Sequence, residues 1–169
     1  MAKQSRDAEF TAYVASRAGW LRKVAYLLSS DWHRADDLVQ ESITKLYTNW
    51  ARAARAENLD GYARTVLVNT FLAEQRSSWR RRTRTSAQTP DGVTAGTDLD
   101  VSMDLRQALA ALPPKQRATV VLRYYCDLSV EQTAEAMGCS SGNVKSQSSR
   151  ALGALRVSAA LRVAGGFEG

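Results

Sequence analysis

Five arginines stand close together near residue 80 and surround a tryptophan. They are Arg76, Arg80, Arg81, Arg82 and Arg84, and Trp79 lies among them. Cations at this density repel one another unless an anion neutralises them, so the segment predicts a polyanionic partner. An indole suits stacking on an exposed base, and Arg64 and Asn69, earlier in the segment, can hydrogen-bond base edges. The alternative is a basic helix end favoured by the helix dipole, with Trp79 packed in a core.

Acidic and amide side chains recur at helical spacing between residues 36 and 41. Asp36, Asp37, Gln40 and Glu41 lie within a few positions of one another, so a helix places them on one side. This strip predicts either an ordinary solvated surface or a docking site for a basic partner.

A short helix, a glycine turn and a second helix are predicted over residues 129–156. Ser129 and Gln132 form a capping-box pattern, and Gly138 supplies the left-handed residue that ends the first helix. Ser140 or Ser141 caps the second helix. Asn and Gln hydrogen-bond adenine, and Lys and Arg contact phosphate or guanine, so this helix-turn-helix predicts DNA binding. The alternative is an ordinary helical hairpin with a polar face. The polar residues of the second helix are Ser141, Asn143, Lys145, Ser146, Gln147, Ser149 and Arg150.

Apolar residues recur at helical spacing over 10–28, 35–50, 62–72 and 103–112, and β-branched alternation is absent. Pro113 and Pro114 end the last of these stretches, and Pro114 opens the next helix. Residues 85–102 are rich in Thr, Ser, Gly and Asp without periodicity, which is typical of a flexible linker. We therefore predict an all-α fold with two small helical domains, residues 7–84 and 103–162, joined by the linker 85–102.

The net charge of +6 on 169 residues is unevenly distributed. Residues 1–84 carry 15 basic and nine acidic side chains, and residues 103–169 carry eight and five. The linker holds three aspartates and no base. The chain therefore consists of two basic domains joined by an acidic tether.

Several classes of protein are excluded by composition. Cys126, Cys139 and His33 lie too far apart in the sequence for a metal-ligand pattern, so we expect no metal and no cofactor. No apolar run exceeds five residues and the first residues contain no signal peptide, which favours a cytoplasmic protein without membrane insertion. A small nuclease needs clustered carboxylates or a histidine base. Asp36 and Asp37 lack a third carboxylate or histidine partner, so we expect that the protein is not an enzyme. The two cysteine side chains are predicted to pack as small apolar groups, and the alternative is that they form a redox switch.

Three stretches resemble the extracytoplasmic-function (ECF) sigma factors of bacteria, which belong to the sigma-70 family. They are ADDLVQESITKLYTNW at 35–50, NLDGYARTVLVNTFLAEQRSSWRRR at 58–82 and LPPKQRATVVLRYYCDLSVEQTAEAMGCSSGNVKSQSSRALGALR at 112–156. They occur in the family's order, and their sequences are most similar to those of an actinobacterial, sigma-E-like subgroup. Asn143 and Ser148 depart from the residues that many members carry at those positions.

The resemblance implies an RNA polymerase sigma factor that directs the core enzyme to specific promoters and promotes DNA melting for transcription initiation. The first domain would be sigma region 2 and the second sigma region 4. The residues that would dock on the β′ clamp helices are Asp36, Asp37, Leu38, Gln40 and Glu41. Those that would contact the −10 element are Tyr62, Arg64, Asn69, Arg76, Trp79 and Arg80. The seven polar residues of the second helix of the helix-turn-helix would read the −35 element.

The implied partners are core RNA polymerase and promoter DNA, with the β flap held on the other face of the second domain. The linker would thread through polymerase towards the RNA exit path. The free protein would be a monomer, and an anti-sigma factor is a candidate partner. Two alternatives remain open at this point: a stand-alone helix-turn-helix repressor, which would normally be a dimer, and an interaction module that sequesters a regulator.

Overall fold

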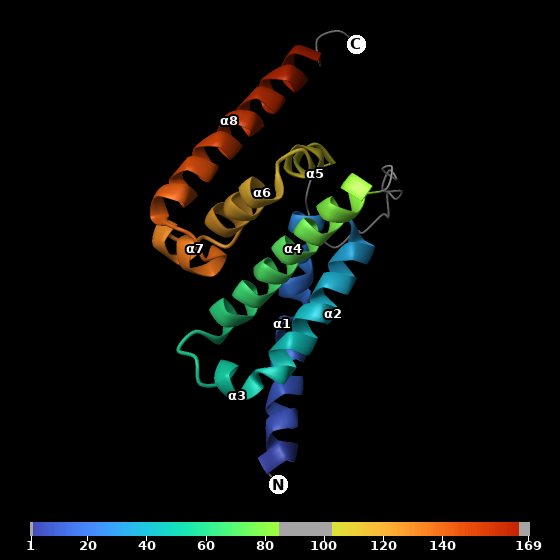
Figure 1. The fold of residues 1–169 in the computed structure, drawn as a ribbon, viewed down its shortest axis with the longest axis vertical. Coiled ribbons are helices and arrows are strands. Elements are labelled where there is room, and N and C mark those ends of the chain that lie inside the picture. Colours follow the sequence, from blue (N-terminus) through green and yellow to red (C-terminus); the bar gives the residue numbers. More distant parts are fainter. Residues whose placement is uncertain (1, 85–102, 166–169) are drawn as a thin grey trace. The chain divides into compact units, whose positions relative to one another are not determined.

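The computed structural model describes residues 2–84 and 103–165, with side chains over 3–81 and 103–156. These residues are helical and contain no β-strand, which confirms the all-α prediction (Figure 1). The chain divides into two compact units, Met1–Leu99 and Asp100–Gly169. The predicted linker, residues 85–102, lies outside the described residues.

Unit 1 is a bundle of three long helices and one short one. They are α1 (Ala2–Ser29), α2 (Trp32–Thr48), α3 (Trp50–Ala53) and α4 (Leu59–Arg84). Each long helix contributes an apolar stripe to one core, as the sequence periodicity predicts. The side chains that fill this core include Leu21 and Leu28 of α1, Leu46 of α2, and Leu67 and Phe71 of α4.

Two helices of unit 1, α2 and α4, begin at side-chain caps. Asp31 precedes α2 and accepts hydrogen bonds from the backbone N–H groups of His33 and Arg34, at 2.8 and 3.3 Å. Asn58 precedes α4, and its Oδ1 accepts from the N–H of Gly61 at 2.9 Å. A Cβ at Gly61 would lie 2.8 Å from Asn58 Nδ2, so a larger residue there would displace the Asn58 side chain from its capping position. The caps satisfy backbone donors that no helical carbonyl reaches.

Aromatic and polar contacts hold the first half of α1 against the rest of the bundle. Phe10 packs edge-on against Tyr47 and Trp50, with ring centroids 5.0 and 5.4 Å apart. Tyr13 donates from its hydroxyl to Asp60 of α4 at 2.8 Å, and Arg17 pairs with the same carboxylate at 3.0 Å. Burial and the Asp60 carboxylate raise the pKa of Tyr13, because both disfavour the phenolate. These contacts fix the start of α4 relative to α1.

Unit 2 contains the predicted helix-turn-helix. Its elements are α5 (Met103–Ala110), α6 (Pro114–Val120), the π-helical turn η1 (Val121–Tyr125), α7 (Val130–Met137) and α8 (Ser141–Gly165). Ser129 and Gln132 form the reciprocal capping box at the start of α7, and Gly138 ends that helix with φ +65°, both as predicted. Ser140 Oγ accepts from the N–H of Asn143 at 3.0 Å, so Ser140 rather than Ser141 caps α8.

The π-helical turn was not predicted from the sequence. It ends where the N–H of Cys126 donates to the carbonyl of Val121 at 3.0 Å, and Asp127 follows with φ +56°. A π turn inserts one residue into a helix, so it changes the direction of the side chains that follow. Tyr124 and Tyr125, the last two residues of this turn, are exposed by 53% and 45%.

Candidate nucleic-acid and protein interfaces

The acidic strip on α2 divides into an outward face and a buried residue. Asp37, Gln40 and Glu41 are exposed, whereas Leu38 is only 1% exposed and belongs to the core. Leu38 therefore contributes to the core of unit 1 rather than to the exposed strip, and its contact with the clamp helices stays a prediction. We name Asp37, Gln40 and Glu41 the α2 acidic face.

Asp36 has a partner within unit 1. Arg22 Nε lies 2.7 Å from its Oδ1, and the Arg22 guanidinium lies over the Trp32 ring at 4.2 Å. Trp32 in turn stacks on Tyr26, with ring centroids 4.0 Å apart. The Arg22–Asp36 ion pair thus adds to the stacked rings that join α1 to α2. Asp36 therefore helps to hold the two helices together, whereas Asp37 and Glu41 do not.

Glu74 brings a further carboxylate from α4 towards the α2 acidic face. Partial burial and the negative charges of Glu41 and Asp37 raise the pKa of Glu74, and Arg34 and Arg81 oppose this shift. Lys45 lies 3.6 Å from Glu41 and donates to Thr70 Oγ1 of α4 at 3.1 Å. The sequence does not place Glu74 in the acidic group, since only the packing of α4 on α2 brings it near Asp37 and Glu41.

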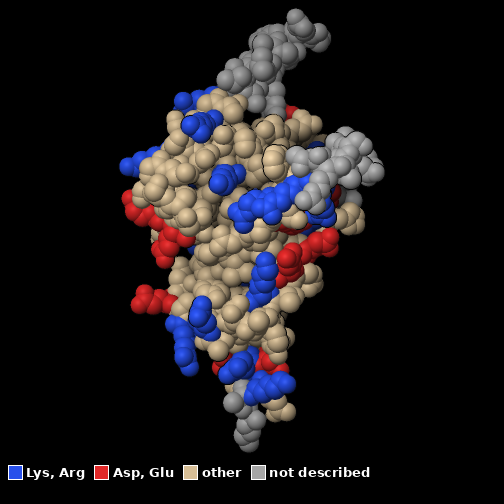
Figure 2. All heavy atoms as spheres, in the orientation of Figure 1, with Lys and Arg blue, Asp and Glu red and all other residues tan. Residues whose placement is uncertain are grey.

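One line of polar residues follows the exposed side of α4. Tyr62, Asn69 and Arg76 lie seven positions apart, and Arg80 follows one turn later, so a helix directs all four to the same side. Tyr62 is half-buried and the other three are exposed. Figure 2 shows basic side chains along the carboxyl-terminal half of α4, next to acidic ones over α2. We name these four residues the α4 polar line.

Arg64 does not join this line. Its guanidinium lies over the Trp20 ring of α1 at 5.7 Å, and its Nε is buried without a hydrogen-bond partner among the described residues. The position is about 160° around the helix from Tyr62. Arg64 therefore points towards α1 rather than along the α4 polar line, because it stands two residues from Tyr62 rather than three, four or seven. Its contact with the −10 element stays a prediction.

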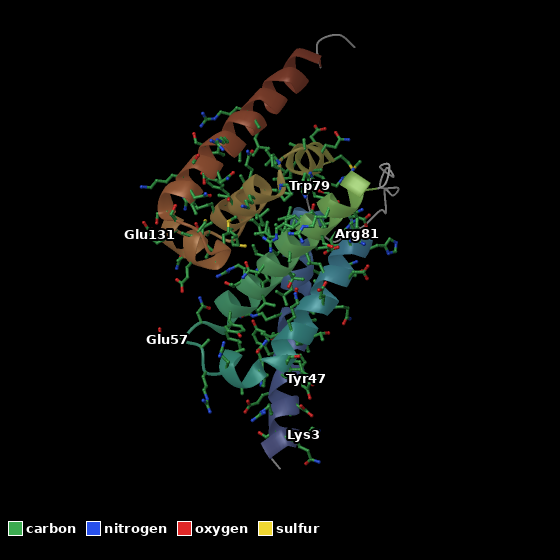
Figure 3. All side chains as sticks on the ribbon, in the orientation of Figure 1. Lys3, Tyr47, Glu57, Trp79, Arg81 and Glu131 are labelled. Carbon is green, nitrogen blue, oxygen red and sulfur yellow. The ribbon has the colours of Figure 1, made fainter. Side chains whose placement is uncertain are left out.

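Trp79 is the most exposed large apolar side chain of the described residues, at 67%. Trp79 lies on the same side of α4 as Val68 and Leu72, which are both buried. Its position in the helix is therefore one that faces the core earlier in α4. The alternative in which Trp79 packs in the core is excluded. Figure 3 shows Trp79 and Arg81 on the carboxyl-terminal half of α4. The helix thus carries an indole beyond the part of the bundle that would cover it.

The exposed side of α8 carries small polar and basic side chains. Asn143, Lys145, Ser146, Ser149 and Arg150 are exposed, and no acidic residue occurs between 141 and 156. Ser141 and Gln147 are half-buried, since they lie beside Val144 and Ala151 on the face that packs inward. The structure therefore brings five of the seven predicted residues to one open surface, and leaves two at its edge.

A different surface of unit 2 is acidic and aromatic. Asp127, Glu131 and Glu135 are exposed on α7 and the turn before it, and Tyr124 and Tyr125 are exposed nearby in the sequence. Figure 3 places Glu131 on α7. Such a surface disfavours phosphate, because its carboxylates repel the anion. The sequence analysis named no residues for it, because the direction of the tyrosines depends on the π-helical turn.

The described residues contain no cluster of three or more His, Cys, Asp or Glu side chains placed to hold a metal ion. Cys126 and Cys139 are unbridged and half-buried. Among the helices that the structure describes, none is both long and apolar enough to cross a membrane.

The chain matches the family profiles described as Sigma-70 region 2, over residues 5–81, and Sigma-70, region 4, over residues 102–155. These two matches cover units 1 and 2 respectively. The order along the chain is the one that the resemblance implied.

Named relatives agree with these profiles. The chain is 36% identical over 157 residues to the RNA polymerase sigma-E factor of Streptomyces avermitilis, which covers 88% of this chain and 83% of the relative. It is 34% identical over 141 residues to the ECF RNA polymerase sigma factor EcfG of Rhodopseudomonas palustris, covering 78% and 74%. Among solved structures, the sigma factor RpoE of Bartonella quintana, crystallised with the anti-sigma factor NepR, superimposes with a TM-score of 0.74 at 28% identity. That match covers 89% of this chain and 96% of the other.

Proposed function

Because the chain belongs to the ECF sigma factors of the sigma-70 family, and is an RNA polymerase sigma factor of transcription initiation, we propose how its two units divide that work. Unit 1 binds core polymerase and opens the −10 element, and unit 2 reads the −35 element. Sigma factors are known as non-catalytic regulators, and this chain supplies contacts rather than chemistry. The observation that carries the proposal is the separation of an acidic face on α2 from acid-free polar surfaces on α4 and α8.

The α2 acidic face docks on the β′ clamp helices of polymerase. Its three residues are exposed, and only Glu41 of them has an ion-pair partner in the described residues, Lys45 at 3.6 Å. That contact lies on the solvent side of one helix and costs little to exchange for a basic partner. Asp36 is bound by Arg22 and serves to hold α2 in place, so it is a weaker candidate for docking.

The α4 polar line and Trp79 engage the −10 element. Arg76 and Arg80 attract the phosphate backbone, and Asn69 stands between them and Tyr62 with an amide that can pair with a base edge. Trp79 offers an uncovered ring on which a base can stack once it leaves the duplex. Unstacking a base costs a few kcal/mol, which this stacking offsets.

Unit 2 binds the −35 element through α8. In a helix-turn-helix the second helix lies in the major groove with its first residues at the base edges, and Asn143, Lys145 and Ser146 occupy those positions. The exposed tyrosines 124 and 125 and the exposed carboxylate of Glu131 suit a protein rather than DNA, and the β flap of polymerase is their proposed partner.

An anti-sigma factor is a further proposed partner. The sigma factor RpoE of Bartonella quintana was crystallised with one. By this proposal the protein works in the cytoplasm, where polymerase and promoters are, and it is a monomer when free.

Runoff transcription with purified core RNA polymerase tests the proposal. We expect the chain to direct initiation at a promoter selected from a random library, and core enzyme alone to give no runoff product from it. A protein that binds the library DNA without polymerase and scatters light as a dimer would instead be a helix-turn-helix repressor. A protein that binds polymerase but yields no transcript from any member of the library would be a sequestering module.

A further inference from the structure

A lysine of α2 connects the two candidate surfaces of unit 1. Lys45 Nζ lies 3.6 Å from Glu41 Oε1, on the α2 acidic face, and it donates to Thr70 Oγ1 of α4 at 3.1 Å. Thr70 is 2% exposed, and its own hydroxyl donates to the carbonyl of Val66 at 2.7 Å. The Thr70 oxygen is therefore oriented to accept from Lys45. The ammonium group thus reaches from one helix to the other.

The two contacts of this ammonium differ in strength. The distance to Thr70 is that of a hydrogen bond, whereas 3.6 Å to the Glu41 carboxylate is too long for one. The side chains of Lys45 and Glu41 are 47% and 55% exposed, so water screens their charges. Exposed ion pairs of this kind are weak. Another cation can therefore take Glu41 from Lys45 at little cost.

Lys45 stands at the edge of the α4 polar line. Thr70 directly follows Asn69, and one residue turns a helix by about 100°, so the two side chains lie on adjacent sides of α4. The lysine stem has four flexible carbons, which lets its ammonium move towards the line. The cations that act on the Glu74 carboxylate are Arg34 and Arg81. Glu41 is thus the carboxylate that Lys45 faces.

We propose that Lys45 is a phosphate-contacting residue of unit 1 that Glu41 masks until the α2 acidic face binds polymerase. A basic group of polymerase that pairs with Glu41 removes the counter-charge of Lys45. The ammonium then pairs with a phosphate of the −10 strand beside Asn69. Because coupling between two binding sites is reciprocal, DNA on α4 also strengthens polymerase binding on α2. The inference rests on the proposed function, which assigns polymerase to α2 and DNA to α4.

The first test needs no polymerase. Fluorescence anisotropy measures the affinity of the full-length protein for a labelled single-stranded oligonucleotide that carries the −10 sequence. Glu41→Gln unmasks the lysine, so it should bind about threefold more tightly and steepen the slope of log affinity against log salt by about 0.7. Lys45→Met should lose little, and the double variant should lack the gain of E41Q. Such a cycle isolates the interaction between the two side chains.

The second test repeats the titration with the protein bound to saturating core polymerase. There K45M should bind the oligonucleotide about threefold more weakly than the wild type, with a slope shallower by about 0.7. Glu9→Gln and Lys3→Met are the controls, because they remove the same charges at exposed positions of α1. Neither should change the affinity in either state. All these positions are exposed, so the helical circular dichroism should be that of the wild type.

Three results would overturn the inference. An equal loss in K45M with and without polymerase would make Lys45 an ordinary phosphate contact that Glu41 does not mask. No loss in either state would remove Lys45 from DNA binding, and a gain in E9Q equal to that in E41Q would show an effect of net charge alone. The proposed function fails separately. If reversing the charges of Asp37 and Glu41 left polymerase binding intact, docking on α2 would be contradicted, while the cycle without polymerase would still decide whether Glu41 masks Lys45.

Discussion

α4 and α8 both present an open polar side to solvent, yet the side chains on them differ in kind. The open side of α4 carries guanidinium groups, and an uncovered indole lies beside them at the end of the helix. The open side of α8 carries two serines, an asparagine, a lysine and a single arginine, and no aromatic residue occurs between 141 and 156. One helix suits bases that have left the duplex, and the other suits the groove of an intact duplex.

The two units also differ in where they place acid. Unit 1 exposes Asp36, Asp37 and Glu41 together on α2, next to the basic end of α4. Unit 2 exposes Asp127, Glu131 and Glu135 on α7 and the preceding turn, and it has no acidic residue on α8 from 141 to 156. Each unit therefore has one surface that attracts phosphate and another that repels it. By the proposed function, each unit uses one of these surfaces for DNA and the other for protein.

The largest expected effect comes from reversing charge on the α2 acidic face. Replacing Asp37 and Glu41 together by lysine should weaken binding to core polymerase by about 100-fold or more, because like charges placed opposite each other cost several kcal/mol. Both residues are exposed, so the helical circular dichroism should be unchanged. Affinity is measured by fluorescence anisotropy of labelled protein titrated with core enzyme.

Charge reversal at two exposed carboxylates outside the proposed interfaces provides the matched control. Replacing Glu9 and Glu57 together by lysine changes one residue of α1 and one of the loop before α4. It should reduce polymerase binding far less than the α2 double variant. Equal losses in the two variants would show that net charge matters rather than the α2 acidic face.

Replacing Trp79 by alanine should separate melting from binding. Stacking of a base on an aromatic ring contributes about 1–3 kcal/mol, so W79A should slow open-complex formation about tenfold or more. Its affinity for core polymerase should remain as in the wild type, because α2 is unaltered. Permanganate reactivity of unpaired thymines measures the rate of opening.

Trp79→Phe should retain most of the opening rate, since it keeps an exposed ring. A rate in W79A equal to that of the wild type, or an equal loss in opening and polymerase binding, would contradict the contrast between α4 and α8.

A smaller effect is expected from Lys145→Ala on α8. Removing one phosphate contact should weaken promoter binding by the polymerase complex about threefold, and it should reduce the slope of log affinity against log salt by about one. The rate of opening from the bound complex should not change. A slower opening step with unchanged salt dependence would assign Lys145 to melting and remove the difference between the units.

Much of the fold follows from local patterns that the sequence displays directly. Ser129, Gln132 and Gly138 specify the start and end of α7 within a few residues, and the structure has the capping box and left-handed glycine where they predict them. Apolar spacing likewise predicts the core face of each long helix. These features depend on neighbours in the sequence, so the sequence alone is sufficient for them.

Parts of the candidate surfaces depend on neighbours in space instead. Leu38 is adjacent in sequence to the acids of α2 but turns into the core, and Arg64 turns towards Trp20 of α1. Glu74 approaches the acids of α2 only because α4 packs there. The directions of Tyr124 and Tyr125 follow from a π-helical turn that has no sequence signature. Each of these four placements is decided by tertiary packing or by a local change in helix geometry.

The smallest effect concerns Glu74, where unit 1 brings carboxylates together. Burial and the charges of Glu41 and Asp37 raise its pKa in the folded protein. As the pH rises through the interval between the ordinary and the raised pKa, the unfolded chain loses this proton first, so the free energy of unfolding falls. Glu74→Gln should remove that loss and stabilise unit 1 at pH 7 by about 0.3 kcal/mol, a small value because the side chain is largely exposed to water. The gain should vanish below the ordinary glutamate pKa of about 4.3, where both side chains are neutral.

Tryptophan fluorescence during urea unfolding measures this change in unit 1 alone, because Trp20, Trp32, Trp50 and Trp79 all belong to it. Glu57→Gln is the control, because it removes the same charge at another place. Glu57 is exposed in the loop before α4 (Figure 3). An equal gain in both variants would mean that overall charge, not the approach of Glu74 to α2, sets the stability. A gain in E74Q that persists at acidic pH would mean that packing of the amide, not relief of repulsion, is responsible. A gain confined to E74Q and to neutral pH would show that the carboxylates of Glu74, Asp37 and Glu41 lower the stability of unit 1 by repelling one another. The open side of α8 has no acidic residue and therefore no such repulsion.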